Sequence, residues 1–299
     1  LAFTGEADGD EAGTALAVGD VDGDGLDDLL VGARGSDRSV TDGGAVYLLA
    51  GPLDASGDLG DADAIHEGVT LTARGADWTL TLADLDGDGV DDVFLADPLS
   101  GTTGGVEVFL DAAYGGDLDL ATADVTLLGV DPGERAGSAL ALADFDGDGA
   151  LDALVGAELA SPGRLATGAV YVMAGLGTGT SDLSTADATL ETTDTGSSIG
   201  DVVTAGDYDG DGVADVAVGD WWGGARAGRV YLLHGPFAGA LSVASADATL
   251  EGETADAAAG WALATGDLDL DGADDLVVAA YGDDVYRGAV YLVLGGPGF

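Results

Sequence analysis

The chain is short of several chemical groups, and each shortage excludes a class of protein. Its 299 residues contain no Cys, no Lys and only two His, and no run of about 20 apolar residues occurs. Disulfide and thiol chemistry are therefore absent, a lysine-containing phosphate loop cannot form, and we expect no membrane insertion. The chain begins at Leu1 without a signal peptide, so we expect a mature fragment of a secreted or cell-surface protein.

Negative charge dominates the composition. Asp and Glu number 56 against eight basic residues, all of them Arg, which gives a formal net charge of −48. A surface of this sign repels nucleic acid and anionic membranes. We therefore expect neither as a partner.

One acidic stretch recurs five times along the chain. Its copies begin at Asp20, Asp84, Asp144, Asp207 and Asp267, and each has Asp at positions 1, 3, 5 and 9 and Gly at position 6. Alternate carboxylates on a tight turn converge on one point, where two of them repel by roughly 4 kcal/mol at ~4 Å. A divalent cation relieves this repulsion. Oxygen ligands at such density favour calcium over magnesium, so we expect about five calcium ions.

The predicted ligands are the four carboxylates of each loop and the backbone carbonyl at position 7. They are Asp20, Asp22, Asp24, Leu26 and Asp28; Asp84, Asp86, Asp88, Val90 and Asp92; Asp144, Asp146, Asp148, Ala150 and Asp152; Asp207, Asp209, Asp211, Val213 and Asp215; and Asp267, Asp269, Asp271, Ala273 and Asp275. An EF-hand is excluded because its loop requires Glu at position 12, which is Val or Leu in all five copies. A solvated acidic turn without metal is the remaining alternative.

The segments between the loops predict short strands. In the unit that starts at residue 134, strands are predicted at 138–143, 154–157, 168–175 and 188–191. Four strands per ~60 residues, with no helical periodicity, indicate a β-propeller blade rather than a solenoid. The predicted fold class is therefore all-β, a β-propeller of four-stranded blades, with five blades favoured.

We expect one propeller domain over residues 1–299. Its five repeats are predicted at about 6–73, 74–128, 129–190, 191–250 and 251–299. The last repeat stops after its third strand, whereas residues 1–5 have the pattern of a fourth strand. We expect residues 1–5 to close the last blade, so that no strand edge is left open. The alternative is donation of this strand to a neighbouring molecule, which would build an assembly.

These loops and their flanking strands resemble the FG-GAP repeat family, which includes the propellers of integrin α-subunits and many secreted bacterial proteins. The Phe-Gly of the family is replaced here by Ala12-Gly13, Ala136-Gly137, Ile199-Gly200 and Ala259-Gly260, and Leu270 replaces a loop Gly. The resemblance covers all five units. It implies calcium loops between strands one and two on a lower face, and a ligand-binding upper face made by the other loops. Family propellers usually have seven blades, so the alternative is a five-blade portion of a seven-bladed propeller.

On the implied topology, Arg and aromatic residues gather on the upper face. The candidate ligand-binding residues are Arg34, Arg74, Trp78, Arg135, Arg164, Trp221, Trp222, Arg226, Tyr281, Tyr286 and Arg287, with Trp261 near a first strand. Guanidinium donors beside exposed rings suit a carboxylate-bearing peptide or a glycan. Alternatively, each Arg neutralises an acid in its own loop and the Trp side chains fill the centre of the ring.

The function predicted from these features is a calcium-stabilised extracellular binding or adhesion module with a protein or glycan ligand. A structural subunit that assembles into a filament or surface layer is the alternative. Catalysis is disfavoured because His66 and His234 both fall on the predicted lower face, and no Ser–His–Asp arrangement is evident. A glycan-active enzyme that uses two upper-face acids, such as Asp97 and Asp220, is the least favoured possibility.

Overall fold

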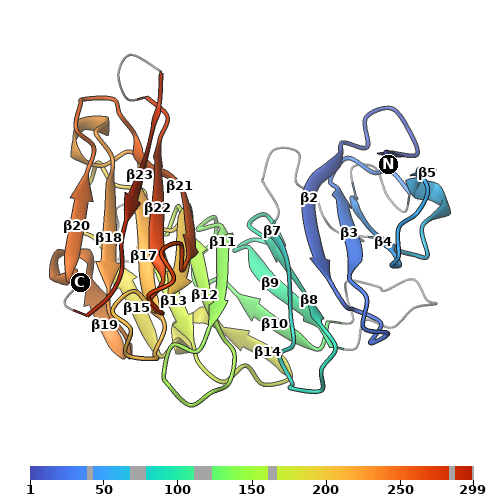
Figure 1. The fold of residues 1–299 in the computed structure, drawn as a ribbon, viewed down its shortest axis with the longest axis horizontal. Helices are drawn as coiled ribbons and strands as arrows, with labels where there is room; N and C mark the ends of the chain where they lie inside the picture. Colours follow the sequence, from blue (N-terminus) through green and yellow to red (C-terminus); the bar gives the residue numbers. More distant parts are fainter. Residues whose placement is uncertain (39–42, 68–78, 111–122, 161–166, 283–286, 298–299) are drawn as a thin grey trace. The chain divides into compact units, whose positions relative to one another are not determined.

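The predicted all-β class is confirmed by a computed structural model, which describes residues 1–38, 43–67, 79–110, 123–160, 167–282 and 287–297. The strands form five small sheets, antiparallel within each blade, which are the blades of a five-blade β-propeller. Figure 1 labels most of these strands. The chain divides into two compact units. One comprises Leu1–Leu128 with Gly177–Ser181, and the other comprises Gly129–Leu176 with Asp182–Phe299.

The first unit contains two blades. The strands of the first blade are β2 (Ala12–Gly19), β3 (Asp28–Ala33), β4 (Ala45–Leu49) and β6 (Ala64–Glu67). Those of the second are β7 (Thr79–Ala83), β8 (Asp92–Asp97), β9 (Gly105–Phe109) and β10 (Val125–Leu128), extended by β14 (Gly179–Asp182). The short strands β1 (Phe3–Thr4) and β5 (Gly57–Asp58) pair separately, and η1 (Leu59–Asp61) follows β5.

The second unit contains three blades. The third blade has β11 (Ala136–Ala143), β12 (Asp152–Ala157), β13 (Ala169–Met173) and β15 (Ala188–Glu191), extended by β19 (Gly239–Ser242). The fourth has β16 (Val202–Gly206), β17 (Asp215–Asp220), β18 (Arg229–Leu233) and β20 (Ala248–Glu251), and the fifth has β21 (Ala259–Gly266), β22 (Asp275–Ala280) and β23 (Ala289–Val293). Short 3-10 turns are η3 (Leu183–Thr185), η4 (Gly224–Arg226) and η5 (Val243–Ser245).

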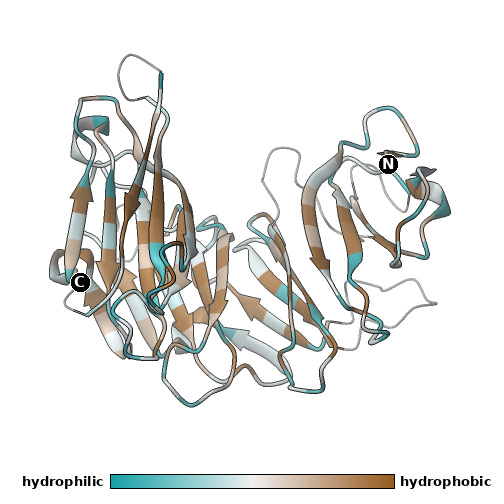
Figure 2. Ribbon diagram, in the orientation of Figure 1, coloured by the Kyte–Doolittle hydropathy of each residue, from teal (hydrophilic) through white to brown (hydrophobic). Residues whose placement is uncertain are grey.

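Every predicted calcium loop joins the first and second strands of its blade, as expected. The predicted repeats each contain one blade, but their bounds and the single domain stay predictions. Figure 2 shows that the strands carry most of the apolar residues and that the connecting turns are more polar.

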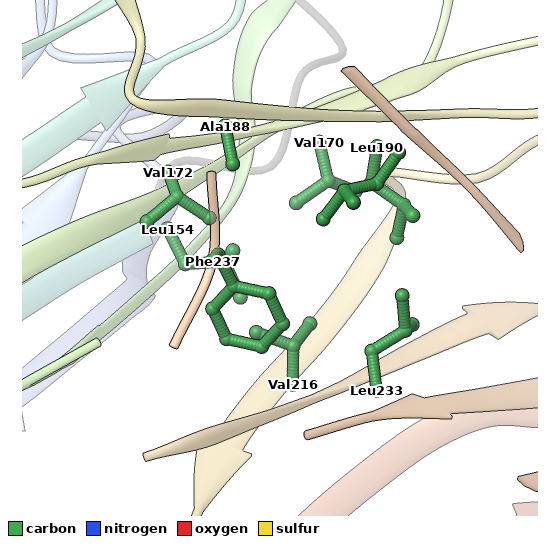
Figure 3. Close-up of a pocket in the computed structure, with 9 residues that line it drawn as sticks. Leu154, Val170, Val172, Ala188, Leu190, Val216, Leu233 and Phe237 are labelled. Carbon is green, nitrogen blue, oxygen red and sulfur yellow. The ribbon is translucent and has the colours of Figure 1, made fainter. Parts of the chain in front are cut away.

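The third strands of the first four blades are buried on both faces, which explains their unbroken apolar runs, whereas one face of β23 in the fifth blade is exposed. Tyr231 and Leu233 of β18 pack in one cluster with Val216 and Phe237, whereas Val230 and Leu232 pack in another with Leu276 and Val278. A strand with covered faces on both sides needs no polar alternation. Figure 3 shows the first of these interfaces, where side chains from the third and fourth blades point towards one another. The space left among them is about 10 Å³, too small and too apolar for an ordered water.

The Ala-Gly pairs at the start of the first strands produce a bulge. Register shifts occur between Ala12 and Ala15, Ala136 and Ala139, and Ala259 and Ala262. Gly260 has a φ of 85°, and a Cβ there would lie 2.7 Å from the carbonyl oxygen of Arg229. Only Gly fits such a close backbone approach.

The position of β1 bears on the predicted closing strand. β1 pairs in parallel with β5, and β15 pairs in parallel with β19. In both pairs a Gly N–H donates to the residue before the partner strand: Gly57 to Ala2, and Gly239 to Asp187. Residues 1–5 thus occupy the place of a fourth strand relative to β5. Their pairing with β23 stays a prediction.

Candidate functional site

Backbone N–H groups shape each acidic loop around the carboxylate at position 1. Asp20 accepts hydrogen bonds from Gly23, Asp24 and Gly25 at 2.8, 3.1 and 2.8 Å. The loops that begin at Asp84, Asp144 and Asp207 repeat all three bonds. This wrapping requires a left-handed backbone at positions 4 and 6, where φ is 73° at Gly23 and 84° at Gly25.

The fifth loop departs from this pattern at position 4. Leu270 has a φ of 65°, a conformation that a branched side chain adopts only at a cost of roughly 1–2 kcal/mol. Its side chain is 85% exposed, so burial does not compensate for that cost. The loop still closes, because Asp267 accepts bonds from Asp271 and Gly272, both at 3.1 Å.

The Asp at position 9 has a structural role that the sequence reading did not assign. Asp28, Asp92, Asp152, Asp215 and Asp275 are all buried. In each, Oδ2 accepts the N–H of position 2, at 2.8 to 3.1 Å. In Asp28, Asp152, Asp215 and Asp275, Oδ1 also accepts the N–H of a Gly that follows the third strand. The only available signal was that this Asp always precedes the second strand.

The loops bring their carboxylates together as a cation site requires. Oxygens of positions 1, 3 and 9 lie within 4.8 Å of one another in three loops: Asp20, Asp22 and Asp28; Asp84, Asp86 and Asp92; and Asp144, Asp146 and Asp152. In the fourth loop, Asp207, Asp209 and Asp211 do the same. Calcium–oxygen distances of about 2.3–2.6 Å place ligands at such separations, so these residues fit calcium.

Several carboxyl groups of the acidic loops have a raised pKa. Desolvation, followed by the neighbouring carboxylates, raises the pKa of Asp22 and of Asp269 above the ordinary value. Burial raises the pKa of Asp152 and Asp215 as well. The ligand role of all 25 predicted residues, including the position-7 carbonyls, stays a prediction.

A second site lies in the second unit, where aromatic rings surround a small pocket. Ring centroids are 4.5 Å apart for Trp221 and Trp222, 4.8 Å for Trp221 and Trp261, and 4.7 Å for Trp261 and Tyr281. Trp221 is held by a 2.6 Å hydrogen bond from its Nε1 to Asp201. Trp222, Trp261 and Tyr281 stay exposed, so their rings are accessible to a ligand.

Arg226 and Asp256 complete the lining of this pocket, with Trp221, Trp222, Ala258 and Tyr281. The guanidinium Cζ of Arg226 lies 4.3 Å from the centroid of Trp222, a cation–π arrangement. Arg226, Asp256 and Ala258 have φ values of 68°, 65° and 54°. Such strain costs on the order of 1–3 kcal/mol per residue and is concentrated at functional sites.

The loops that carry the pocket are joined by backbone hydrogen bonds. The N–H of Ala258 donates to the carbonyl of Arg226 at 3.0 Å, and that of Ala259 donates to Ala227 at 3.0 Å. The loop between β17 and β18 is therefore fixed to the loop that precedes β21. This fixes Arg226 and Trp222 relative to Asp256.

The structure brings together only some of the predicted ligand residues. Trp221, Trp222, Arg226 and Tyr281 line the pocket, and Trp261 packs against Trp221 and Tyr281. Arg34 and Arg135 instead form ion pairs with Glu11 and Glu158. Arg287 precedes β23 and does not line the pocket. Arg74, Trp78, Arg164 and Tyr286 lie outside the described residues.

Two further Arg residues also form ion pairs. Arg38 contacts Glu6, and Arg229 contacts Asp194 at 3.1 Å and Glu251 at 2.8 Å. Among the described residues, Arg226 makes no ion pair. The partners of the four paired Arg residues lie 22 to 35 positions away in sequence, so these pairs are not the ones expected from the alternative in which each Arg neutralises an acid in its own loop.

The two acids considered for catalysis are each fully buried. Asp220 accepts hydrogen bonds from Ser197 Oγ at 2.7 Å and from the Ser198 N–H at 3.1 Å. Asp97 accepts from the Leu99 N–H at 2.9 Å, and its Oδ2 has no partner. Burial raises the pKa of both. Neither carboxylate is exposed to a substrate.

Comparison with known proteins finds the same repeat of loops and strands in the sequence. The FG-GAP repeat pattern matches residues 12–49, 136–173 and 259–293. The chain thus contains FG-GAP repeats at three places. The integrin alpha pat-2 of Caenorhabditis briggsae is 32% identical over 244 residues, which are 74% of this chain and 19% of that protein. The expected resemblance to integrin α-subunits is confirmed.

An enzyme family also contains FG-GAP-like sequence. The human phosphatidylinositol-glycan-specific phospholipase D is 33% identical over 195 residues, covering 59% of this chain and 23% of that protein. The chain therefore spans about a fifth of the length of these curated relatives. A solved lectin structure from Agrocybe aegerita aligns with 94% of this chain and 66% of its own, at a TM-score of 0.46 and 17% identity. At that level of similarity, it supports no conclusion about fold or ligand. No helix in the described part of the chain is long and apolar enough to span a membrane.

Proposed function

We propose that this FG-GAP propeller is a calcium-stabilised extracellular binding or adhesion module without catalytic activity. The ligand presents a carboxylate, on a peptide or a glycan, to the pocket lined by Trp222, Arg226 and Tyr281. About five calcium ions hold the acidic loops. The sequence similarity of the chain to integrin α-subunits supports secretion or display on the cell surface.

The observation that carries this proposal is that Arg226 makes no ion pair within the part of the chain that the structure describes. The chain has 56 acidic residues and eight Arg, so an Arg without a carboxylate partner is unexpected. Arg226 is exposed, and Trp222 holds its guanidinium at the edge of a pocket. Its fork of N–H donors is thus available for a carboxylate from outside. The exposed rings beside it provide apolar contact area for a sugar or a peptide side chain.

Direct binding measurements test the ligand site. A hexuronic acid oligosaccharide and an oligo-glutamate peptide serve as probes, with quenching of the Trp fluorescence as readout. Wild type binds at least one of them, and Arg226→Gln and Trp222→Ala each weaken that binding by about tenfold or more. Arg135→Gln is the matched control because Arg135 is paired with Glu158 outside the pocket. Equal binding by Arg226→Gln and wild type, with equal melting temperatures, would refute the site.

Assembly into a filament or surface layer is the second candidate, and one observation favours it. Within the described residues, β23 pairs with β22 on one side, and its other edge can take either residues 1–5 or a strand of another chain. Such an edge accepts a strand from another chain. Light scattering across a concentration series decides between the two, since a monomer at all concentrations would exclude assembly.

A further inference from the structure

His234 places a ring nitrogen beside the fourth acidic loop. It follows β18, and its Nδ1 lies 3.5 Å from Oδ2 of Asp209, position 3 of that loop. Ligand atoms of His234, Asp209 and Asp215 all lie within 4.8 Å of one another. At the matching place after the third strand, the other blades have Ala50, Leu110, Ala174 and Leu294. None of these side chains can bind a metal.

Backbone hydrogen bonds fix His234 over the loop. Its own N–H donates to Oδ2 of Asp247 at 2.9 Å, and the next N–H, of Gly235, donates to Oδ1 of Asp215 at 2.9 Å. Within the described residues, the buried imidazole Nε2 has no hydrogen-bond partner, and the polar contact of the ring is the one that Nδ1 makes towards Asp209.

The separation of these atoms suits a transition metal. Ligands about 2.0–2.2 Å from a tetrahedral ion lie ~3.3–3.6 Å from each other, which matches Nδ1 and Oδ2. Calcium takes oxygen ligands, whereas an imidazole combined with carboxylates suits zinc and its neighbours in the first transition row. We propose that His234, Asp209 and Asp215 bind a divalent transition metal of the zinc class. Because Asp209 and Asp215 are shared with the calcium set of the proposed function, the two ions compete for the fourth loop.

Cobalt(II) tests this site because it replaces zinc and shifts the NMR signals of imidazole protons bound to it. The protein is titrated with Co²⁺ in millimolar calcium. Wild type is expected to bind one Co²⁺ with a shifted imidazole signal, and Zn²⁺ is expected to displace it. His234→Ala is expected to lose the signal and to bind Co²⁺ more than about tenfold more weakly, since losing even an outer-shell partner costs that much.

A gain-of-site variant provides the matched comparison. Ala174 occupies the same place in the third blade, where its N–H donates to Asp187 at 2.9 Å and that of Gly175 donates to Asp152 at 2.8 Å. Ala174→His is therefore expected to create a second Co²⁺ site with its own imidazole signal. Unchanged Co²⁺ binding in His234→Ala would overturn the proposal, as would the absence of a shifted imidazole signal in wild type. That absence would leave His234 as a simple ion-pair partner of Asp209.

The outcome is separable from that of the calcium proposal. Loss of the Co²⁺ signal in His234→Ala, with calcium-dependent melting retained, supports both. A Co²⁺ signal in a protein whose melting ignores calcium supports the His234 site and refutes the calcium loops.

Discussion

The backbone N–H of Gly175 donates a 2.8 Å hydrogen bond to Oδ1 of Asp152, while Oδ2 of the same side chain accepts the N–H of Phe145 at 2.9 Å. Asp152 therefore connects the end of the third strand to the start of the acidic loop. It belongs both to the predicted ligand set and to the packing of the blade.

Replacement of Asp152 separates these two roles. Asp152→Ala leaves two buried N–H groups without acceptors and is expected to lower the free energy of unfolding by about 2–4 kcal/mol at every calcium concentration. Asp146→Ala, in the exposed part of the same loop, is expected to lower it only when calcium is present. Urea unfolding across a calcium series measures both. An Asp152→Ala variant as stable as wild type in chelator would contradict the structural role.

The strained Leu270 offers a test by stabilisation. Leu270→Gly removes the strain of the left-handed backbone and is expected to raise the free energy of unfolding by about 1 kcal/mol. The reverse change, Gly87→Ala, occurs at the same loop position of the second blade, where φ is 79° and a Cβ would meet no atom within 4 Å. It is expected to destabilise by a similar amount. Thermal unfolding in saturating calcium measures both changes in stability. Two changes of the same sign would contradict the account of strain at this loop position.

The buried Glu107 is expected to make the free energy of unfolding depend on pH. Burial, with Asp97 as a further cause, raises the pKa of Glu107 to about 7, and its Oε2 has no partner. The native state therefore binds the carboxyl proton of Glu107 more tightly than the unfolded chain does. Below the ordinary pKa of 4.5, Glu107 does not destabilise the protein. As the pH rises from there to about 7, Glu107 lowers the free energy of unfolding by an increasing amount.

Glu107→Gln removes this charge and keeps an acceptor for Ser100 Oγ, which donates to Glu107 at 3.1 Å. Relative to wild type, the variant is expected to be more stable by roughly 3 kcal/mol at pH 8 and about equal at pH 4.5. Urea unfolding at the two pH values, in excess calcium, checks this. An equal difference at both pH values would show that the pKa of Glu107 is not raised in the native protein.

The fold was predictable because its signals are local and repeated. The spacing of Asp20, Asp22, Asp24 and Asp28 defined the loop, and the apolar runs on either side defined the strands that it joins. The fourth strand of the third blade was predicted at 188–191, where β15 lies. The strands β14 and β19 were not predicted, because polar segments such as Gly179–Asp182 pair only with the blade that precedes them.

The ligand face was less predictable because ion pairing depends on residues far apart in sequence. Nothing near Arg135 indicated that Glu158, 23 residues later, would hold its guanidinium. Trp221 and Trp222 were recognisable as an exposed aromatic pair, but the contribution of Trp261 depends on the packing of the fourth and fifth blades. His234 was assigned to the correct segment, but its contact with Asp209 is visible only in three dimensions.

The central claim is that divalent ions hold the acidic loops and so stabilise the blades. Thermal unfolding from excess chelator to millimolar calcium tests it most directly. Each site is expected to add about 2.7 kcal/mol once free calcium reaches 100 times its dissociation constant, so the melting temperature should rise steeply over the series. A melting temperature that is the same in chelator and in calcium would contradict the account.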